Sequence, residues 1–373
     1  MRTLSNLFQL TTFGWVLVAL ALAAAVSLVT MPLVKSLSVK VGAVDVPKDN
    51  RRMHSRPIPR MGGLAIFFGF IFAVLLILPL ELSTQGMLLG AVLIVILGIF
   101  DDIYALPAKL KFLVQLVAAV IAVMAGNRIE VLSNPNIFSD NPYWELGWLA
   151  VPVTVIWIVA LTNAVNLIDG LDGLACGVST ISSLTMLVIA LLVSEDSVAI
   201  MMGALAGACI GFLPYNFNPA KIFMGDTGAT FLGFVLATVS VQGMFKMYTI
   251  ISFVVPFLML GLPIFDVCFA VIRRLLHGQS PMAPDRGHVH HRLIDMGLSQ
   301  KQAVGVLYVV SAILGLSAVV LTTSGAIKAM VALVALAAAA AVAAKLFLHS
   351  GPPEGEQTDG QGEVPPKGED EHG

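Results

Sequence analysis

Long apolar runs separated by short polar segments dominate this chain. Each run is close to the ~20 residues that cross the hydrocarbon core of a bilayer as a helix. The runs cover residues 13–34, 61–80, 86–100, 110–126, 148–166, 174–193, 198–214, 228–244, 248–272, 303–322 and 325–348. This pattern predicts an all-α, polytopic integral membrane protein with about 11 transmembrane helices.

Composition agrees with a membrane protein, because 57% of the 373 residues are hydrophobic and only 12% are charged. A soluble chain carries roughly twice that charged fraction. No small-residue cleavage pattern follows the first run, so we expect a retained span and not a signal peptide. We therefore expect one membrane domain over residues 1–349. Residues 350–373 are rich in Gly, Pro, Glu and Asp, which predicts a disordered tail.

The three cysteines, Cys176, Cys209 and Cys268, all fall in apolar runs and show no CxxC spacing. This placement is typical of packing residues, and it indicates neither a disulfide framework nor a zinc site.

Basic residues predict the orientation in the membrane, because Lys and Arg are retained on the cytoplasmic side of short loops. Alternate loops between residues 35 and 301 hold 15 of the 21 Lys and Arg residues, and the first loop alone holds seven. The N-terminus is therefore expected outside and the C-terminus in the cytoplasm.

Five polar clusters fall on the same predicted cytoplasmic side. In chain order they are RPIPRMGG, DDIYALPAKLK, NAVNLIDGLDGLA, NFNPAKIFMGDTG and DRGHVHHRL. Each adjoins an apolar run, where ionisable side chains are costly unless they have partners. Their common side predicts that they form one site.

Asp226 is the most informative single residue, since it lies at a membrane boundary between Gly225 and Gly228, just before a new apolar run. A carboxylate there needs a metal ion, a cation or a water-filled cleft. The start of the following helix favours an anion, so a diphosphate held with Mg²⁺ would satisfy both groups. The structural alternative is a simple helix N-cap. Phe223 offers a ring for base stacking, although an interfacial aromatic is the commoner explanation.

Asp101 and Asp102 end another apolar run, and Lys111 follows ten residues after Asp101. Adjacent carboxylates repel, so a nearby cation or metal is needed to keep both ionised. Lys111 is a candidate contact for a phosphate. The alternative is a cluster of charges that marks the membrane interface.

Asn163, Asn166, Asp169 and Asp172 recur at intervals of three. On an ideal helix such positions sweep half the circumference, so they cannot share one narrow face. The glycines that follow Asp169 and Asp172 indicate that the helix opens here and lets these groups converge on a ligand. The alternative is an Asn/Asp/Gly turn between two spans.

A histidine-rich loop precedes the tenth apolar run and supplies His288, His290, His291 and Arg292. Zinc binding lacks the Cys or H-E-x-x-H context that such sites show. We favour phosphate or sugar contacts, with a basic loop attracted to anionic lipid as the alternative.

Taken together and in this order, the five clusters resemble the polyprenyl-phosphate N-acetylhexosamine-1-phosphate transferase family over about residues 40–310. The H-x-H-H-R loop is similar to that of the branch that uses UDP-N-acetylglucosamine (UDP-GlcNAc). The branch that transfers phospho-MurNAc-pentapeptide usually carries three consecutive histidines followed by an acidic residue. Here Val289 interrupts the run and Arg292 follows it, so we favour the first branch.

The resemblance implies roles for the central residues. Asp226 and Asn166 would hold Mg²⁺, with Mn²⁺ as a substitute. Phe223 would stack on uracil and Asp172 would hydrogen-bond it, while Lys111 would contact the diphosphate.

It also implies roles around that centre. Asp101, with Asp102 beside it, would deprotonate or orient the lipid phosphate. The loop that closes over the sugar phosphate would contain His288, His290, His291 and Arg292. The substrate-binding set would further include Asn163, Asp169, His54 and Arg60, the last two in the first loop near the nucleotide.

The expected function is transfer of GlcNAc-1-phosphate from UDP-GlcNAc to undecaprenyl phosphate, as the first membrane step of a teichoic-acid or O-antigen type polymer. The expected location is the bacterial inner (plasma) membrane, with a cytoplasmic active site, lipid contacts, no nucleic acid partner and a homodimeric state. Two alternatives stay open: the phospho-MurNAc-pentapeptide transferase of peptidoglycan synthesis, and a transporter of nucleotide sugars or lipid-linked sugars. Transporters tend to place polar sites near the bilayer midplane and to show internal repeats, and neither feature is visible here.

Overall fold

The fold is taken from a computed structural model of the whole chain. The structure describes residues 11–47, 56–133, 141, 143–243, 251–276 and 288–323.

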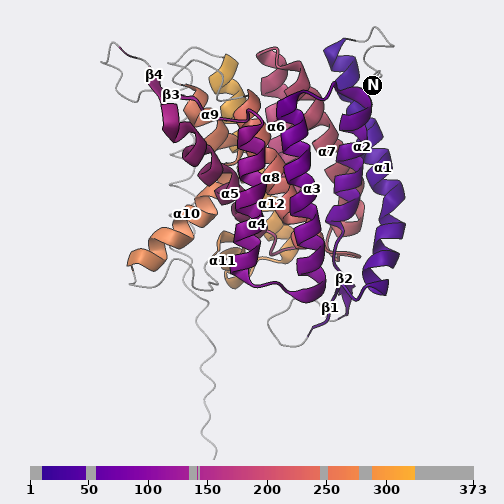
Figure 1. Cartoon of the computed structure of the whole chain (residues 1–373). Coiled ribbons are helices and arrows are strands. Elements are labelled where there is room, and N and C mark those ends of the chain that lie inside the picture. Colours follow the sequence, from indigo (N-terminus) through magenta and orange to yellow (C-terminus); the bar gives the residue numbers. More distant parts are fainter. Residues whose placement is uncertain are drawn as a thin grey trace, which may run out of the picture.

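Long helices run side by side along one common direction and form a bundle (Figure 1). The helices are α1 Thr12–Lys40, α2 Gly63–Ile77, α3 Leu82–Tyr104, α4 Ala108–Met124, α5 Ala150–Leu167, α6 Leu174–Leu192, α7 Asp196–Asn216, α8 Gly225–Gly243, α9 Ile251–Met259, α10 Gly261–Leu276, α11 Val289–Asp295 and α12 Gln300–Thr323. A short 3-10 helix, Gly147–Leu149, precedes α5.

The predicted all-α membrane architecture is confirmed. Six of the described helices are long and apolar enough to cross a membrane: α1, α3, the segment Gly147–Leu167 that contains α5, α6, α7 and α12. The first eight predicted runs and the tenth each correspond to one helix. The ninth run, 248–272, is instead divided between α9 and α10, and the eleventh, 325–348, lies outside the described residues. The number of spans and the orientation of the termini stay predictions.

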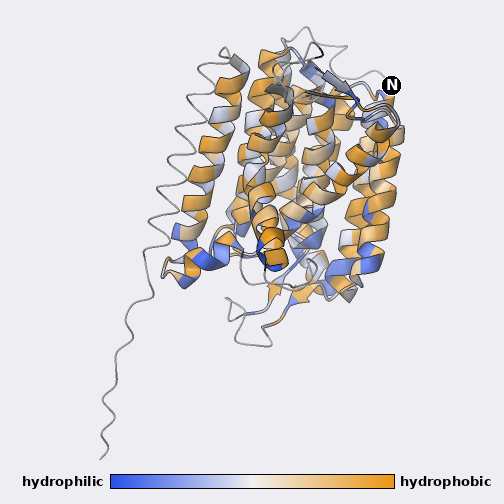
Figure 2. Ribbon diagram, turned by 90° about the vertical axis from the view of Figure 1, so that its left-hand side faces the viewer, coloured by the Kyte–Doolittle hydropathy of each residue, from blue (hydrophilic) through white to orange (hydrophobic). Residues whose placement is uncertain are grey.

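The outer surface of the bundle is apolar, as Figure 2 shows for one side. Large hydrophobic side chains such as Val29, Leu33, Ile156 and Leu316 are each more than 60% exposed. In water such a surface would aggregate, whereas in a bilayer it faces acyl chains.

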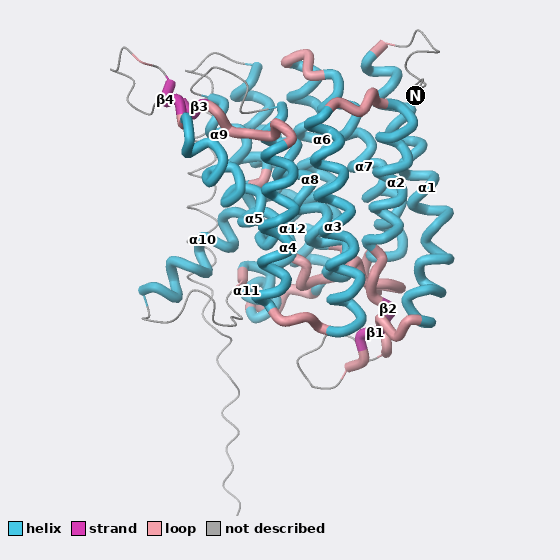
Figure 3. The backbone as a smooth tube through the Cα atoms, in the orientation of Figure 1, coloured by secondary structure: helices cyan, strands magenta, loops and turns pink. Residues whose placement is uncertain are grey.

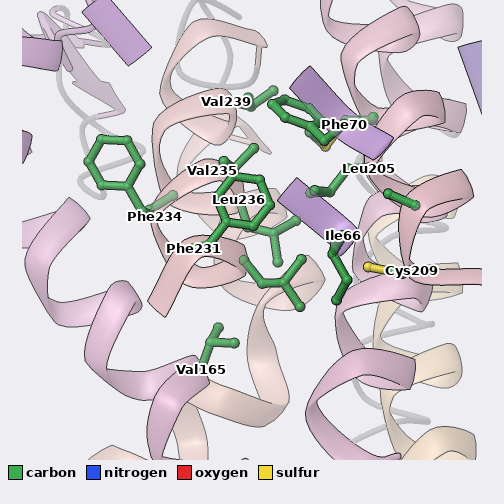
Figure 4. Packing of buried hydrophobic residues seen from close by; sticks show 14 of the residues in the cluster. Ile66, Phe70, Val165, Leu205, Cys209, Phe231, Phe234, Val235, Leu236 and Val239 are labelled. Carbon is green, nitrogen blue, oxygen red and sulfur yellow. The ribbon is translucent and has the colours of Figure 1, made fainter. Parts of the chain in front are cut away.

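Helix α8 lies in the middle of the bundle, where its side chains pack against neighbours on several sides (Figure 4). Phe231 and Phe234 are fully buried, and the Phe231 ring meets Phe67 and Phe70 of α2 edge-on. Close packing around one central helix fixes the position of its first turn, which carries Asp226.

Glycines let three helices approach α8 closely. A Cβ atom at Gly63 of α2 would overlap Gly228, one at Gly98 of α3 would overlap Thr227, and one at Gly233 of α8 would lie 2.7 Å from the Cα of Thr162 in α5. Small residues at membrane helix contacts allow this closeness. Two of these contacts lie at the first turn of α8, so the glycines bring α2 and α3 directly against it.

Two short antiparallel hairpins, which the apolar pattern did not predict, lie at opposite ends of the bundle (Figure 1). In one, β1 Val44–Asp45 pairs with β2 Ile58–Pro59. In the other, β3 Val131–Ser133 pairs with β4 Tyr143–Glu145. The first hairpin leads directly into Arg60 and so places this residue at one end of the bundle.

Candidate functional site at one end of the helix bundle

The five polar clusters of the sequence meet at the end of the bundle that carries β1 and β2, where loops gather in Figure 3. The first loop contacts the fourth cluster through backbone hydrogen bonds from Phe223 N to Pro59 O and from Gly62 N to Phe223 O, both 2.9 Å. The fourth cluster also contacts the second through Asp102 and the third through Asp172, and the fifth meets the third where His290 packs on Gly170. The structure therefore brings the five clusters together at one end of the bundle, while the roles of their residues stay predictions.

Asp102 lies against the first turn of α8. Its carboxylate accepts hydrogen bonds from Asp226 N at 3.0 Å, from Thr227 N at 3.1 Å and from the Thr227 hydroxyl at 2.7 Å. The side chain is fully buried, and the Nε atom of Arg60 lies 3.4 Å away. A carboxylate is unfavourable at the end of its own helix α3, and the positive N-terminus of α8 offsets this cost.

This arrangement corrects one expectation. The start of α8 was expected to offer its backbone amides to a bound diphosphate. Two of these amides, of Asp226 and Thr227, already donate to Asp102. The anion at this helix N-terminus is therefore a side chain of the protein, and Asp102 holds the first turn of α8, which carries Asp226.

Lys111 lies between Asp101 and Asp226. Its Nζ atom is 2.8 Å from Asp101 Oδ2 and 3.1 Å from Asp226 Oδ2. The other oxygen of Asp226 faces Arg60, whose Nη2 atom is 4.0 Å away. Asp101 also accepts a hydrogen bond from Leu106 N at 2.7 Å. The two adjacent aspartates thus have different partners, and Asp226 has a cation near each of its oxygens.

The four polar residues of the third cluster separate into different environments. The helix opens here as expected: α5 ends at Leu167, and Gly173 has φ +80°. Asn163 donates to Gln115 Oε1 in α4 at 2.7 Å and to Val159 O at 2.8 Å, so its NH₂ group joins α5 to α4. Within the described residues, the Asn166 side chain makes no hydrogen bond.

Asp172 is held within the protein. Its Oδ2 atom accepts hydrogen bonds from Asn218 Nδ2 and Ala220 N, both at 3.0 Å, and Asn218 also donates to Gln300 at 2.6 Å. These contacts join the loops before α6 and α8 to the start of α12. The uracil contact expected for Asp172 stays a prediction, and so does the stacking role of Phe223, which is partly exposed.

Asp169 lies in the same electrostatic environment as the other carboxylates. Burial, together with the neighbouring charges of Asp226 and Asp102, raises the pKa of Asp169 to about 7, while Arg60 acts in the opposite direction. A group of carboxylates that raise one another's pKa is a region where an added cation is stabilised.

The histidine loop is held from two sides. Asp266 of α10 accepts a hydrogen bond from Val289 N and is hydrogen-bonded to His288 Nδ1, both at 2.8 Å. On the other side a Cβ atom at Gly170 would overlap the His290 ring, so this ring lies directly beside the third cluster. His291 packs against His290 with ring centres 4.3 Å apart.

Two residues of the histidine loop, His290 and Arg292, have distinct electrostatic environments. Burial, with His291 next in importance, lowers the pKa of His290 to about 4, so this ring is neutral at pH 7. Arg292 lies over the ring of Phe269, with its Cζ atom 4.8 Å from the ring centre.

The residues at the site suit a hard divalent cation that takes few protein ligands. No group of three or more His, Cys, Asp and Glu side chains in the described part of the chain could hold a metal by itself. Mg²⁺ is commonly bound by one or two carboxylates plus waters and substrate phosphates. Asp226, still 21% exposed, and the unbonded amide of Asn166 offer this kind of oxygen set.

The sequence did not predict some residues at this end of the bundle, and one predicted residue cannot be placed. His54 lies outside the described residues. Asp266, Asn218 and Gln115 were not among the predicted site residues. Asp266 carried a signal, because it is an ionisable residue within an apolar run, which is the same signal that identified Asp226. Gln115 has no comparable signal in the sequence.

The helices and the site together define a polytopic membrane protein whose carboxylates, basic side chains and histidines gather at one end of the bundle. Groups of this kind suit phosphorylated substrates. The profile described as "Glycosyl transferase family 4" matches residues 84–244. The chain belongs to this family and is a transferase.

Curated relatives extend the match beyond that segment. The "Probable undecaprenyl-phosphate N-acetylglucosaminyl 1-phosphate transferase" of Bacillus subtilis (strain 168) is 46% identical over 298 residues, which cover 80% of this chain and 82% of the relative. The "Decaprenyl-phosphate N-acetylglucosaminephosphotransferase" of Mycolicibacterium smegmatis is 35% identical over 76% of this chain and 77% of the relative. The "Undecaprenyl-phosphate alpha-N-acetylglucosaminyl 1-phosphate transferase" of Yersinia pestis is 30% identical over 77% of this chain and 79% of the relative.

Proposed function

We propose that this protein transfers GlcNAc-1-phosphate from UDP-GlcNAc to undecaprenyl phosphate, giving undecaprenyl-diphosphate-GlcNAc and UMP. The names of the similar proteins support the sugar and a polyprenyl phosphate acceptor. The observation that carries the proposal is the convergence of Asp101, Lys111 and Asp226 beside the histidine loop at one end of a membrane bundle.

Charge explains why this set of residues suits the reaction. A phosphate oxygen of the lipid attacks the β-phosphorus of the nucleotide sugar, a new P–O bond forms, and the bond to UMP breaks. Two anions must approach each other, so catalysis depends mostly on positioning and on charge neutralisation. Lys111 and Arg60 are the basic side chains that lie next to Asp226 and are available to the diphosphate.

We propose that the site takes Mg²⁺, with Asp226 and Asn166 as its protein ligands and Mn²⁺ as a substitute. The cation would supply neutralisation of the diphosphate and of the departing UMP. Lys111 Nζ lies 3.1 Å from Asp226 Oδ2, so a cation bound to Asp226 would lie close to this ammonium group and be repelled by it. The diphosphate gives Lys111 a new partner and relieves this repulsion.

Asp101 needs only to orient the acceptor. A phosphate monoester has a second pKa near ~6, so it is largely a competent nucleophile at neutral pH without a strong base. Asp101 already pairs with Lys111 at 2.8 Å, which places the acidic group beside the basic side chain that the diphosphate would contact. The role of a general base is therefore not required of it.

The membrane setting fits a lipid acceptor and a water-soluble donor. The bundle exposes apolar side chains to acyl chains, whereas the polar loops gather at one end. We propose that this end faces the cytoplasm from the bacterial inner membrane, because it holds most of the basic residues. A homodimer is also expected.

The test is release of UMP by the purified protein with undecaprenyl phosphate, Mg²⁺ and one nucleotide sugar at a time. UMP release with UDP-GlcNAc supports the proposal. Release only with UDP-MurNAc-pentapeptide would assign the peptidoglycan reaction instead, and a transporter would release none. Asp226→Asn is expected to abolish UMP release while the protein still inserts into the membrane. Retained activity of this variant would contradict its role as a metal ligand.

A further inference from the structure

Asp266 is a buried carboxylate that the reaction described above does not use. It lies within α10, where Gly261 to Ile272 are otherwise apolar, and only 2% of its surface is exposed. Both oxygens are engaged, Oδ2 with His288 Nδ1 and Oδ1 with Val289 N, each at 2.8 Å. A buried carboxylate is costly, and these contacts with the histidine loop offset that cost.

A second contact fixes the loop to the same helix. Phe269 follows Asp266 by three residues, so the two lie on one side of α10. Arg292 of α11 lies over the Phe269 ring at 4.8 Å. The start of α11 is thus held by Asp266, and its middle is held by the aromatic ring. Together these contacts seat α11 against α10.

The held loop then reaches the reaction site through stacked rings. His288 and His290 are nearly parallel, with an angle of 9° and centres 5.8 Å apart. The His290 ring packs directly on Gly170, the neighbour of Asp169. A contiguous path therefore runs from Asp266 through two histidine rings to the third polar cluster.

We propose that Asp266 is a positioning residue for the transfer reaction. It keeps the proton of His288 on Nδ1 and so leaves the lone pair of Nε2 to accept a hydrogen bond from a hydroxyl group of the sugar phosphate. A carboxylate that holds one ring nitrogen fixes both the tautomer and the orientation of an imidazole. This inference rests on the function proposed above, but the tautomer of His288 can be measured in the protein without substrate.

Asp266→Asn is the sharpest test. Its side-chain oxygen still accepts from Val289 N, whereas its NH₂ group faces His288 Nδ1 and forces the proton onto Nε2. We expect kcat to fall by about 10- to 100-fold, as when a carboxylate that orients a functional histidine is lost. The KM for UDP-GlcNAc should change by less than about 3-fold, since the contacts around Asp226 are intact. The matched control is Asp295→Asn, which changes an exposed acid at the end of α11. It should leave both kcat and KM unchanged.

Two measurements separate positioning from simple anchoring. In ¹⁵N-histidine NMR spectra, His288, assigned by loss of its signals in His288→Asn, should be protonated on Nδ1 in the native protein and on Nε2 in Asp266→Asn. The double variant Asp266→Asn/His288→Asn should be no slower than the more impaired single variant, because both changes remove the same Asp266–His288 hydrogen bond.

Clear outcomes would overturn the proposal. An Nε2-protonated His288 in the native protein would do so, and this spectrum decides the matter even if Asp266→Asn does not fold. Multiplicative losses in the double variant would do so as well, since the two side chains would then act independently. If the native protein releases no UMP from UDP-GlcNAc, the proposed function fails, while the NMR result still reports on the Asp266–His288 pair.

Discussion

The two adjacent aspartates at the end of α3 should respond differently to the same small change. Asp102→Asn keeps the shape of the side chain but replaces one carboxylate oxygen with an NH₂ group. In its better orientation the remaining oxygen accepts from the amide and the hydroxyl of Thr227. The NH₂ group then faces two donors, the amide of Asp226 and the Nε atom of Arg60. The helix α8 therefore loses one of its three hydrogen bonds to residue 102, and the buried ion pair with Arg60 is lost as well.

The size of the loss follows from these contacts. A hydrogen bond to a charged group contributes about 1.5 to 3 kcal/mol, and breaking a buried charged arrangement costs about 3 to 5 kcal/mol. We take about 3 to 5 kcal/mol for Asp102→Asn. With an unfolding entropy of about 2.1 cal/mol/K per residue, this lowers the melting midpoint of a chain of this length by roughly 4 to 6 °C.

The assay is a thermal melt of the detergent-purified protein, followed by the fluorescence of its four tryptophans. Asp101→Asn is the matched control, because its oxygen can still accept from Leu106 N and only the contact with the partly exposed Lys111 is lost. We expect Asp101→Asn to lower UMP release while its midpoint moves by less than about 2 °C. Equal midpoints for Asp102→Asn and the native protein would refute the capping role argued for Asp102.

Further predictions concern the cation, the histidine loop and pH. Lys111→Gln should tighten Mn²⁺ binding without nucleotide by about 5- to 10-fold, from roughly 1 kcal/mol of relieved competition at Asp226. Unchanged Mn²⁺ affinity by calorimetry, or the same gain in Lys109→Gln, would contradict this. Gly170→Ala should displace the His290 ring and reduce kcat at least 10-fold with little change in melting midpoint, and full activity would show that the contact is dispensable. Because the pKa of His290 is lowered to about 4 from about 6.5, its contribution to stability is complete above pH 6.5 and is lost as pH falls toward 4. The melting midpoint of His290→Gln should therefore fall less than that of the native protein between pH 7 and 5. Equal decreases of the two midpoints would argue against a lowered pKa of His290.

The apolar pattern predicted the helices well for a physical reason. In a bilayer each span must satisfy its own backbone hydrogen bonds, so a run of sufficient length becomes a helix whatever its neighbours are. The run 248–272 broke this rule because the helix is interrupted at Leu260, next to Gly261 and close to Pro263. The β1–β2 hairpin was not predictable, since two paired residues on each side carry no periodic signal.

The sequence predicted which residues would gather, but not which would pair. Consecutive residues on a helix point about 100° apart, so Asp101 and Asp102 meet different neighbours. The packing of α3 against α8 decides that Asp102 meets the backbone amides, and its packing against α4 decides that Asp101 meets Lys111. For the same reason the pattern could not show that Asn163 joins α4, where its partner Gln115 lies.

The pairing sets three carboxylates, those of Asp101, Asp102 and Asp226, against two cations, Lys111 and Arg60, before any substrate enters. Asp102 is committed to the amides of α8 and to Arg60, so Asp101 and Asp226 share the single ammonium group of Lys111. A dication added alone is repelled by this ammonium group, and a diphosphate added alone is repelled by the carboxylates. When both enter, Lys111 can pass from Asp226 to the diphosphate while the cation takes its place. The arrangement therefore favours binding of the nucleotide sugar and the cation together, which under the proposed function is the state from which transfer to the lipid phosphate would start.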